Sequence, residues 1–162
     1  MRPIPLLLLA ALALSGPAQA QNAGQIERSR AGANCPGCNL FQADFGGREL
    51  KGRNFTGARL RQADLSLSVM NRTRFAGADL RDVNAYGAVF SGSSFAHADL
   101  THASFVGTFL QGADFSGAKL VGTNFSGAEM NQARGLTPGQ LAQACGDSTT
   151  ALPPGLHLSS CR

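Results

Sequence analysis

An apolar residue recurs at every fifth position from Leu40 to Met130, without a single insertion. An α-helix requires an apolar period of about 3.6 residues and a half-buried strand a period of about two, so neither explains this pattern. The residue two positions before each apolar centre is usually small, and glycine is frequent two positions after it. Because glycine and asparagine tolerate tight turns, the pattern predicts short extended segments joined by turns, which close the chain into a coil.

The apolar centres fall into four columns when they are sorted every twenty residues. One column contains only leucine, namely Leu40, Leu60, Leu80, Leu100 and Leu120. Another contains only phenylalanine, namely Phe55, Phe75, Phe95 and Phe115. This regularity predicts a four-sided coil, in which each residue stacks on its counterpart twenty positions on and identical side chains form ladders inside the stack.

Several five-residue units resemble the A(D/N)Lxx pattern of the pentapeptide-repeat family. They include Ala43-Asp44-Phe45, Ala63-Asp64-Leu65, Ala78-Asp79-Leu80, Ala98-Asp99-Leu100 and Ala113-Asp114-Phe115. The resemblance covers about residues 38–134, and it implies an all-β solenoid, a right-handed quadrilateral β-helix of about five coils. At about 4.8 Å per coil, such a rod is roughly 23 Å long. The resemblance implies no single activity, because the roles of this family vary.

The first twenty residues have the pattern of a secretory signal peptide. The basic Arg2 precedes an apolar run over residues 6–14, and Ala18-Gln19-Ala20 is a small-x-small cleavage pattern. We therefore expect a signal peptide over residues 1–20, cleaved after Ala20, and an exported protein that is periplasmic or secreted. Nine apolar residues are too few to cross a bilayer. The polar residues 21–34 are expected to be a flexible segment.

The first two cysteines begin the repeat region, which we place at residues 35–134. Export to an oxidising compartment favours disulfides among Cys35, Cys38, Cys145 and Cys161. Cys35 is five residues before Leu40 and Cys38 occupies a small inward position, so we interpret CPGC as a first, half-formed repeat with a local disulfide. A thiol–disulfide redox motif is an alternative, although no βαβ pattern places it at the start of a helix.

Residues 135–162 are predicted to cover the C-terminal end of the rod with a helical cap and a disulfide-bonded tail. Thr137, Pro138 and Gln140 form a capping-box pattern, and Gly146 suits a helix stop, which together predict a helix over residues 138–145. A Cys145–Cys161 disulfide would close a loop of about fifteen residues, worth about 3 kcal/mol. This tail resembles the tails of other exported pentapeptide-repeat proteins.

Basic residues are concentrated in the first coils. Some members of the resembled family mimic DNA and bind topoisomerases, which requires a strongly acidic rod, whereas this chain has a net charge of +4. The chain has one Tyr and no Trp for base stacking, so we do not expect nucleic-acid binding. Binding of anionic envelope polymers is an alternative function, and its candidate residues are Lys51, Arg59, Arg61, Arg72, Arg74 and Arg81.

One outward-facing column is apolar where the repeat is normally polar. Val69, Val89 and Phe109 stand one position before their centres and are expected to stack into an exposed stripe. Such a stripe often marks a contact surface, either for a partner protein or for self-association. Alternatively, the C-terminal tail folds back over the stripe with Leu152, Leu156 and Leu158.

No pattern in the sequence supports catalysis. His97 and His102 stand two positions after their centres and are expected to point outward, and the repeat aspartates are expected to bond turn backbone. We expect no catalytic, cofactor or metal site. The sequence therefore favours an exported, non-enzymatic scaffold or protein-interaction module with an unidentified partner.

Overall fold

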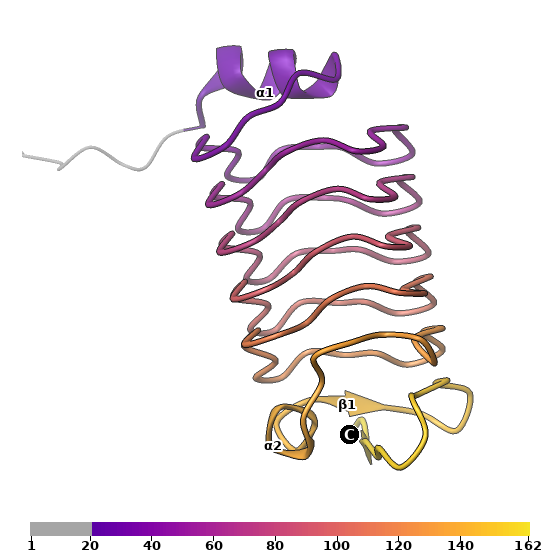
Figure 1. Ribbon diagram of the computed structural model, residues 1–162. Coiled ribbons are helices and arrows are strands. Elements are labelled where there is room, and N and C mark those ends of the chain that lie inside the picture. The colour runs from indigo at the N-terminus through magenta and orange to yellow at the C-terminus, as the bar shows by residue number, and fades with distance from the viewer. Residues whose placement is uncertain (1–20) are drawn as a thin grey trace, which may run out of the picture.

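The computed structural model describes residues 21–162, which wind into a rod of stacked coils (Figure 1). Helix α1 (Ala23–Arg30) lies across the N-terminal end of the rod, and helix α2 (Pro138–Leu141) lies at the other end. The expected signal peptide, residues 1–20 with its cleavage site Ala20, lies outside the described residues.

Parallel main-chain pairing between residues twenty positions apart defines the coils. The residue before each apolar centre bridges to its counterpart one coil on, as in Asp44↔Asp64 and Val69↔Val89. The bridges keep this register from Asn39 to Arg134. The predicted twenty-residue coil with four short sides is therefore observed.

The four sides of each coil are named here by the first apolar centre in their column. Face A starts at Leu40, face B at Phe45, face C at Leu50 and face D at Phe55. The two turn residues after each centre form the corner to the next face. Because the chain passes through the faces in this order, corner B/C and corner C/D are the two edges of face C.

Two of the four inner columns of the rod, on faces A and D, are stacks of identical side chains, as the sequence predicts. On face D the rings of Phe55, Phe75, Phe95 and Phe115 lie almost parallel, with successive centroids 5.6, 5.3 and 5.2 Å apart. All four side chains are fully buried. The phenylalanine ladder therefore packs each coil against the next at van der Waals distance.

Some of the small inward positions carry hydroxyl groups in place of alanine methyl groups. Ser68 and Thr73 are fully buried, and their hydroxyls donate to the carbonyl oxygens of Leu65 at 2.7 Å and Leu50 at 3.0 Å. Each hydroxyl thus has an acceptor inside the rod. This pairing removes the cost of burying a polar group, so serine and threonine are tolerated in the core.

Glycine at the corners has a second role besides its positive φ. Leu67 and Arg72 occupy the same turn position with φ of 57° each, although left-handed backbone is unusual for such residues. Each stands one coil above a glycine, and a Cβ on Gly87 would come within 2.9 Å of the Leu67 side chain. The glycine one coil on therefore makes room for the larger side chain above it.

The N-terminal segment 21–34 is not loose, and this expectation is wrong. Asn22 caps α1 by accepting the Gln25 N–H at 3.0 Å, and the helix residues Ile26 and Ser29 are buried. The Gln25 side chain in turn accepts the N–H of Asn39 in the first coil at 2.7 Å. Helix α1 forms because it covers the open apolar end of the rod and provides a hydrogen-bond acceptor for a backbone N–H of the first coil.

Helix α2 is shorter than the predicted helix over residues 138–145. Its start has the expected capping box, in which Gln140 N–H donates to the Thr137 hydroxyl at 3.2 Å and Thr137 N–H donates to the Gln140 side chain at 2.8 Å. It ends at Leu141, because the residues that follow turn back to pair with the coil above, where Cys145 bridges to Asn124.

Gly146 therefore does not end a helix. It lies in a strand, and a Cβ at this position would approach the Thr150 hydroxyl at 2.7 Å and the Leu158 side chain at 3.0 Å. Glycine is required here for close packing within the tail.

The tail forms a final, irregular coil beneath the rod. Strand β1 (Cys145–Gly146) begins beneath Asn124, and strand β2 (Ser159–Ser160) pairs in parallel with β1. Further along the tail, Ala151 bridges to Glu129. The tail therefore continues the stack and closes its C-terminal end.

The ladder leads to a stability prediction. Replacing Phe95→Ala removes a ring that contacts the phenylalanines above and below it, so we expect the free energy of unfolding to fall by about 3–5 kcal/mol. Chemical denaturation measures this loss. The exposed Tyr86→Ala is the matched control and should change stability by less than about 0.5 kcal/mol. Equal losses in the two variants would contradict the ladder account.

Candidate functional site

The CPGC segment forms the first rung of the rod. Cys35 and Cys38 are joined in a disulfide, with Cα atoms 5.4 Å apart, and the two residues are only 4% and 8% exposed. Cys35 N–H donates to the Asn54 carbonyl at 2.8 Å, and the Cys38 carbonyl accepts the Arg59 N–H at 2.8 Å. Both cysteines therefore follow the repeat register and lie in the core.

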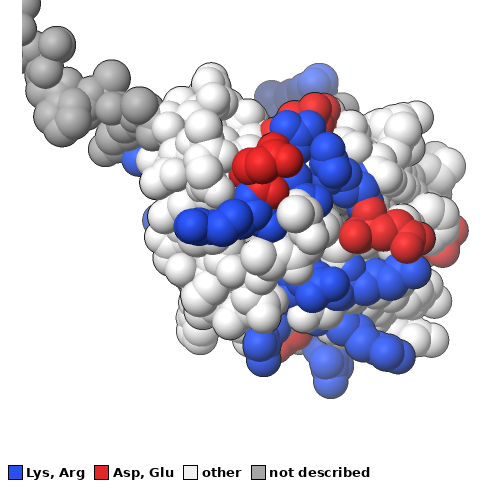
Figure 2. Space-filling view, turned by 90° about the horizontal axis from the view of Figure 1, so that it is seen from above, with Lys and Arg blue, Asp and Glu red and all other residues white. Residues whose placement is uncertain are grey.

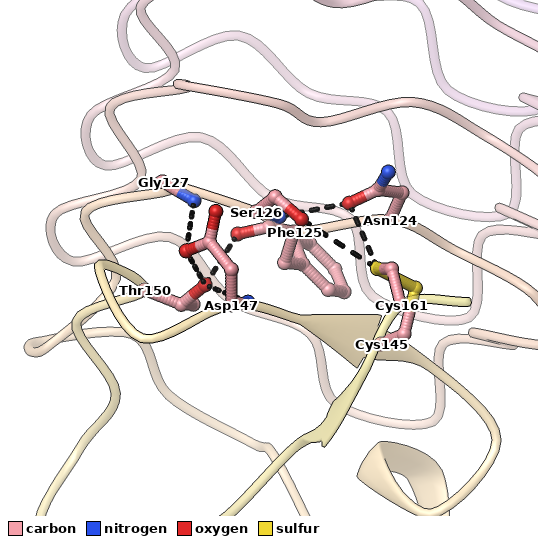
Figure 3. The surroundings of a disulfide bond; sticks show 8 residues. All are labelled: Asn124, Phe125, Ser126, Gly127, Cys145, Asp147, Thr150 and Cys161. Carbon is pink, nitrogen blue, oxygen red and sulfur yellow. Dashed lines mark hydrogen bonds between the residues drawn. A yellow bond between two sulfur atoms is a disulfide. The ribbon is translucent and has the colours of Figure 1, made fainter.

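The Cys145–Cys161 disulfide ties the end of the chain to the last coil (Figure 3). The Cα atoms are 4.9 Å apart, and Cys161 N–H donates to the Gly146 carbonyl at 3.0 Å. The Ser126 hydroxyl donates to Cys161 Sγ at 3.5 Å, and Asn124 Oδ1 lies 3.2 Å from the same sulfur. The disulfide thus packs against polar side chains of the coil above.

A second set of contacts beside the disulfide holds the tail turn (Figure 3). Asp147 Oδ1 accepts the Gly127 N–H at 3.1 Å, and the Thr150 hydroxyl donates to the Phe125 carbonyl at 3.0 Å. These bonds satisfy backbone groups that the end of the repeat would otherwise expose.

The candidate anion-binding residues lie in two groups separated around the rod. Arg59 lies on face A with Arg61 and Arg81 at corner A/B, whereas Lys51 and Arg72 lie at corner C/D with Arg74 on face D. Figure 2, which looks onto the N-terminal end, shows basic side chains spread across this end with acidic side chains between them. The candidate residues therefore do not form one continuous basic surface.

The group near corner A/B is largely neutralised by its neighbours. Arg81 binds Asp79 through two hydrogen bonds of 2.7 and 2.6 Å, and Arg61 Nε lies 3.2 Å from Asp82 Oδ2. The hydrogen bonds from Arg81 lower the pKa of Asp79, and the same contact raises the pKa of Arg81. Arg59 has no acidic group within 4.0 Å among the described residues, and its guanidinium lies 5.4 Å from the centre of the Phe41 ring. Two of the three cations in this group are therefore paired with carboxylates.

The group near corner C/D is less neutralised. Lys51 pairs with Glu49 at 3.4 Å, but within the described residues Arg72 and Arg74 have no acidic group within 4.0 Å. A shallow hollow of about 410 Å³ lies at this corner, lined by Lys51, Gly52, Asn71, Arg72 and Ser91. This hollow is the better candidate for an anion.

The apolar stripe on face C is present, with Val69 and Val89 half-buried and Phe109 exposed. Val69, Val89 and Phe109 bridge to one another in parallel, and Phe109 is 41% exposed. The stripe is widened at corner B/C by Leu67, Tyr86 and Val106, which the sequence interpretation missed. Leu67 is 61% exposed and Tyr86 is 56% exposed. We define the apolar strip as Leu67, Val69, Tyr86, Val89, Val106 and Phe109.

The C-terminal tail does not cover the apolar strip, so that alternative is wrong. Leu152, Leu156 and Leu158 pack against the end of the buried core. Ala151 bridges to Glu129, which is one coil below Phe109 in the same column. The tail thus extends face C downward and leaves the strip exposed.

Comparison with known families identifies the repeat. The model for pentapeptide repeats matches residues 54–92 and 93–132, with eight copies. Residues 54–132 are pentapeptide repeats. Proteins of this family form right-handed quadrilateral β-helices, in agreement with the observed coil. No match was found among curated proteins.

Several solved pentapeptide-repeat structures are similar to this chain. HetL from the cyanobacterium Nostoc sp., involved in heterocyst differentiation regulation, is 27% identical over 59% of this chain and 48% of its own, with a TM-score of 0.41. A protein from the Arabidopsis thaliana thylakoid lumen is 34% identical over 54% of this chain and 53% of its own, with a TM-score of 0.32. The matched part of this chain thus spans about half the length of either protein. QnrB1, a plasmid-mediated fluoroquinolone resistance protein, is 17% identical over 78% of this chain and 79% of its own, with a TM-score of 0.40.

The aspartates of the pentapeptide repeats bond turn backbone, as expected. Asp114 Oδ1 accepts the Ser116 N–H at 2.9 Å and the Ser116 hydroxyl at 2.6 Å, and these bonds lower the pKa of Asp114. Burial raises the pKa of Asp99, but the bonds from the hydroxyl and N–H of Thr101 and the nearby Lys119 cation together outweigh it, so the net pKa is lowered. These carboxylates therefore stabilise the turns by accepting hydrogen bonds from them.

Two further findings describe the part of the chain from residue 21 onward. No cluster of three or more His, Cys, Asp or Glu side chains there is arranged to hold a metal ion. None of its helices is long and apolar enough to cross a membrane.

The lowered aspartate pKa values predict acid sensitivity. The pKa values of Asp99 and Asp114 in the folded protein lie below the ordinary value of 3.8. Each carboxylate therefore stabilises the fold above about pH 3.8, and this stabilisation is lost as the pH falls through the folded pKa. We expect the free energy of unfolding to decline below about pH 4. The double change Asp99→Asn and Asp114→Asn should flatten this decline in denaturation curves at several pH values, and an unchanged slope would argue against the assignment.

The terminal disulfides differ in the loops that they close. Changing Cys145→Ser and Cys161→Ser together releases a loop with a sequence separation of 16, so we expect a loss of about 3 kcal/mol. Hydrogen exchange should show the tail opening first. The matched change Cys35→Ser and Cys38→Ser opens a loop with a sequence separation of only 3, so we expect a smaller loss in the free energy of unfolding. A larger loss at the N-terminal pair would contradict this ranking.

Proposed function

We propose that this pentapeptide-repeat protein is an exported, non-enzymatic interaction scaffold whose contact surface is the apolar strip. The observation that carries the proposal is the exposure of large apolar side chains in one place, with Leu67 61%, Tyr86 56% and Phe109 41% exposed. The strip lies on a rigid rod, where side chains keep fixed spacings from coil to coil. A contiguous apolar surface of this kind marks a binding site for another macromolecule.

The geometry of the reactive groups supports a non-enzymatic role. Asp99 and Asp114 are engaged by neighbouring turn residues, and His97 and His102 lie against glycines one coil on. No nucleophile and base converge among these groups. Catalysis requires such convergence around a substrate position.

The thiol–disulfide redox function is a weaker proposal. A redox-active cysteine needs an accessible sulfur, whereas Cys35 and Cys38 are 4% and 8% exposed and lie in the core. Insulin reduction by the mature protein, lost on Cys35→Ser, would revive this function.

Binding of an anionic envelope polymer is a second candidate function. The hollow at corner C/D favours it, because Arg72 lines the hollow and Arg74 stands on the adjoining face D, and neither has an acidic partner within 4.0 Å among the described residues. Such binding would be electrostatic and therefore weakened by salt.

Retention on heparin resin tests this second function. Changing Arg72→Glu should lower the salt concentration needed for elution, whereas Arg61→Glu, which makes the same change of charge at a cation already paired with Asp82, should lower it less. Equal effects of the two changes would show a dependence on net charge alone and would count against a site at corner C/D.

Proximity labelling in the cell envelope tests the scaffold function. Changing Val89→Asp and Phe109→Asp should remove the specific neighbours labelled by the wild-type protein, because a charge on the strip opposes its desolvation. Thermal unfolding should stay close to wild type, since both side chains point outward. Ser94→Asp, an outward position on face D of the same coil, is the matched control and should leave the labelled set unchanged. An identical labelled set for all three proteins would contradict the proposal.

A further inference from the structure

We infer that the apolar strip binds a second copy of this chain, with two rods packed in parallel, face C against face C, about a twofold axis that runs along the rods. The inference rests on the proposed function, because it names the partner of the same surface. It is carried by the charges that border the strip.

Corner B/C has a negative border. Asp44 and Asp64 stand on face B in adjacent coils, and their Oδ1 atoms accept the N–H groups of Gly46 and Ser66 at 2.9 Å each. Gly46 and Ser66 are corner residues, so both carboxylates lean toward face C. Asp44 lies 3.9 Å from Arg30 of its own chain, whereas Asp64 has no cation within 4.0 Å among the described residues, so Asp64 supplies the unpaired negative charge at this edge.

Corner C/D, the other edge of face C, carries the cations Lys51 and Arg72 at the heights of Asp44 and Asp64 along the rod. Lys51 follows Asp44 by seven residues and Arg72 follows Asp64 by eight, so each cation lies in the same coil as one of the carboxylates. With about 4.8 Å of rise per twenty-residue coil, each pair differs in height by only about 2 Å. The other edge of face C is therefore positive where the first is negative.

Symmetry decides which arrangement of two rods uses these borders. A twofold axis along the rods places corner B/C of one copy over corner C/D of the other and keeps every residue at its own height. Asp64 then faces Arg72 of the second copy, and both of these charges are unpaired in their own chain among the described residues. Asp44 faces Lys51, and these two charges are partly offset by Arg30 and Glu49. An axis across the rods instead places corner B/C over corner B/C, where these opposite charges do not meet. Charge complementarity thus favours the parallel arrangement.

Two glutamates in the central column of face C limit the strength of this contact. Glu49 and Glu129 stand above and below the valines and Phe109, and each faces a glutamate in either arrangement. Lys51 lies 3.4 Å from Glu49 and offsets its charge, whereas Glu129 has no cation within 4.0 Å among the described residues. The apolar contact is confined to three coils, about 14 Å. An interface of this size forms a weak, concentration-dependent dimer.

Cysteine cross-linking of the full mature chain distinguishes the arrangements. In the parallel dimer every residue of the central column faces its own copy, so Val69→Cys, Val89→Cys and Phe109→Cys should each form a disulfide-linked dimer on mild oxidation. In an antiparallel dimer only the position on the twofold axis does so, and that result would overturn the inference. Ser94→Cys on face D is the control and should stay monomeric.

Charge exchange supplies an independent test by sedimentation equilibrium at low salt. Asp64→Lys and Arg72→Glu each place like charges together twice in the homodimer, so each should raise the dimer dissociation constant by about tenfold. An equimolar mixture of the two variants restores opposite charges at both contacts and should dimerise like the wild-type protein. A mixture as weak as the separate variants would overturn the parallel arrangement.

These results also separate this inference from the proposed function. A wild-type protein that remains monomeric at high concentration and does not cross-link would overturn the inference. If proximity labelling still depended on Val89 and Phe109, the scaffold function would stand with a different partner. Loss of that dependence as well would remove both.

Discussion

The twenty-residue register of parallel backbone pairing is the constraint on which the rest of this structure depends. Each residue before an apolar centre pairs in parallel with its counterpart one coil on, from Asn39 to Arg134. This register stacks identical side chains, and the near-parallel rings of Phe75 and Phe95 at 5.3 Å show how closely the coils approach. It also aligns outward residues into columns, so a binding surface on the rod consists of residues that are twenty positions apart in the sequence.

A stacked coil leaves two open ends, and this chain closes them by different means. At the N-terminal end, α1 covers the first coil and the Cys35–Cys38 disulfide lies within it. At the C-terminal end, α2 and the tail complete a last irregular coil, which the Cys145–Cys161 disulfide holds in place. Terminal caps of this kind keep repeat rods from associating end to end through their apolar cores. The faces are then left as the surfaces available for recognition.

The repeat region was predictable from the sequence because stacking relates each residue mainly to its counterpart in the next coil. The ladder of face D, the inward cysteines and the stripe of Val69, Val89 and Phe109 all follow from counting positions. Helix α1 was not predictable in this way, because Ile26 is its only large apolar residue and its support comes from Gln25 and the first coil. Leu67, Tyr86 and Val106 were missed because they occupy turn positions and join face C only around the corner of the folded coil.

Surface and core thus have separate roles in this protein, with register holding the rod together and the apolar strip available for binding. Hydroxyl-radical footprinting tests this separation most directly, by comparing dilute purified protein with protein in the cell envelope, the compartment that we propose for it. We expect Tyr86 and Phe109 to be oxidised in the dilute sample and protected in the envelope, while Phe95 and Phe115 stay unreacted in both. Equal oxidation of Tyr86 and Phe109 in the two samples would contradict the account.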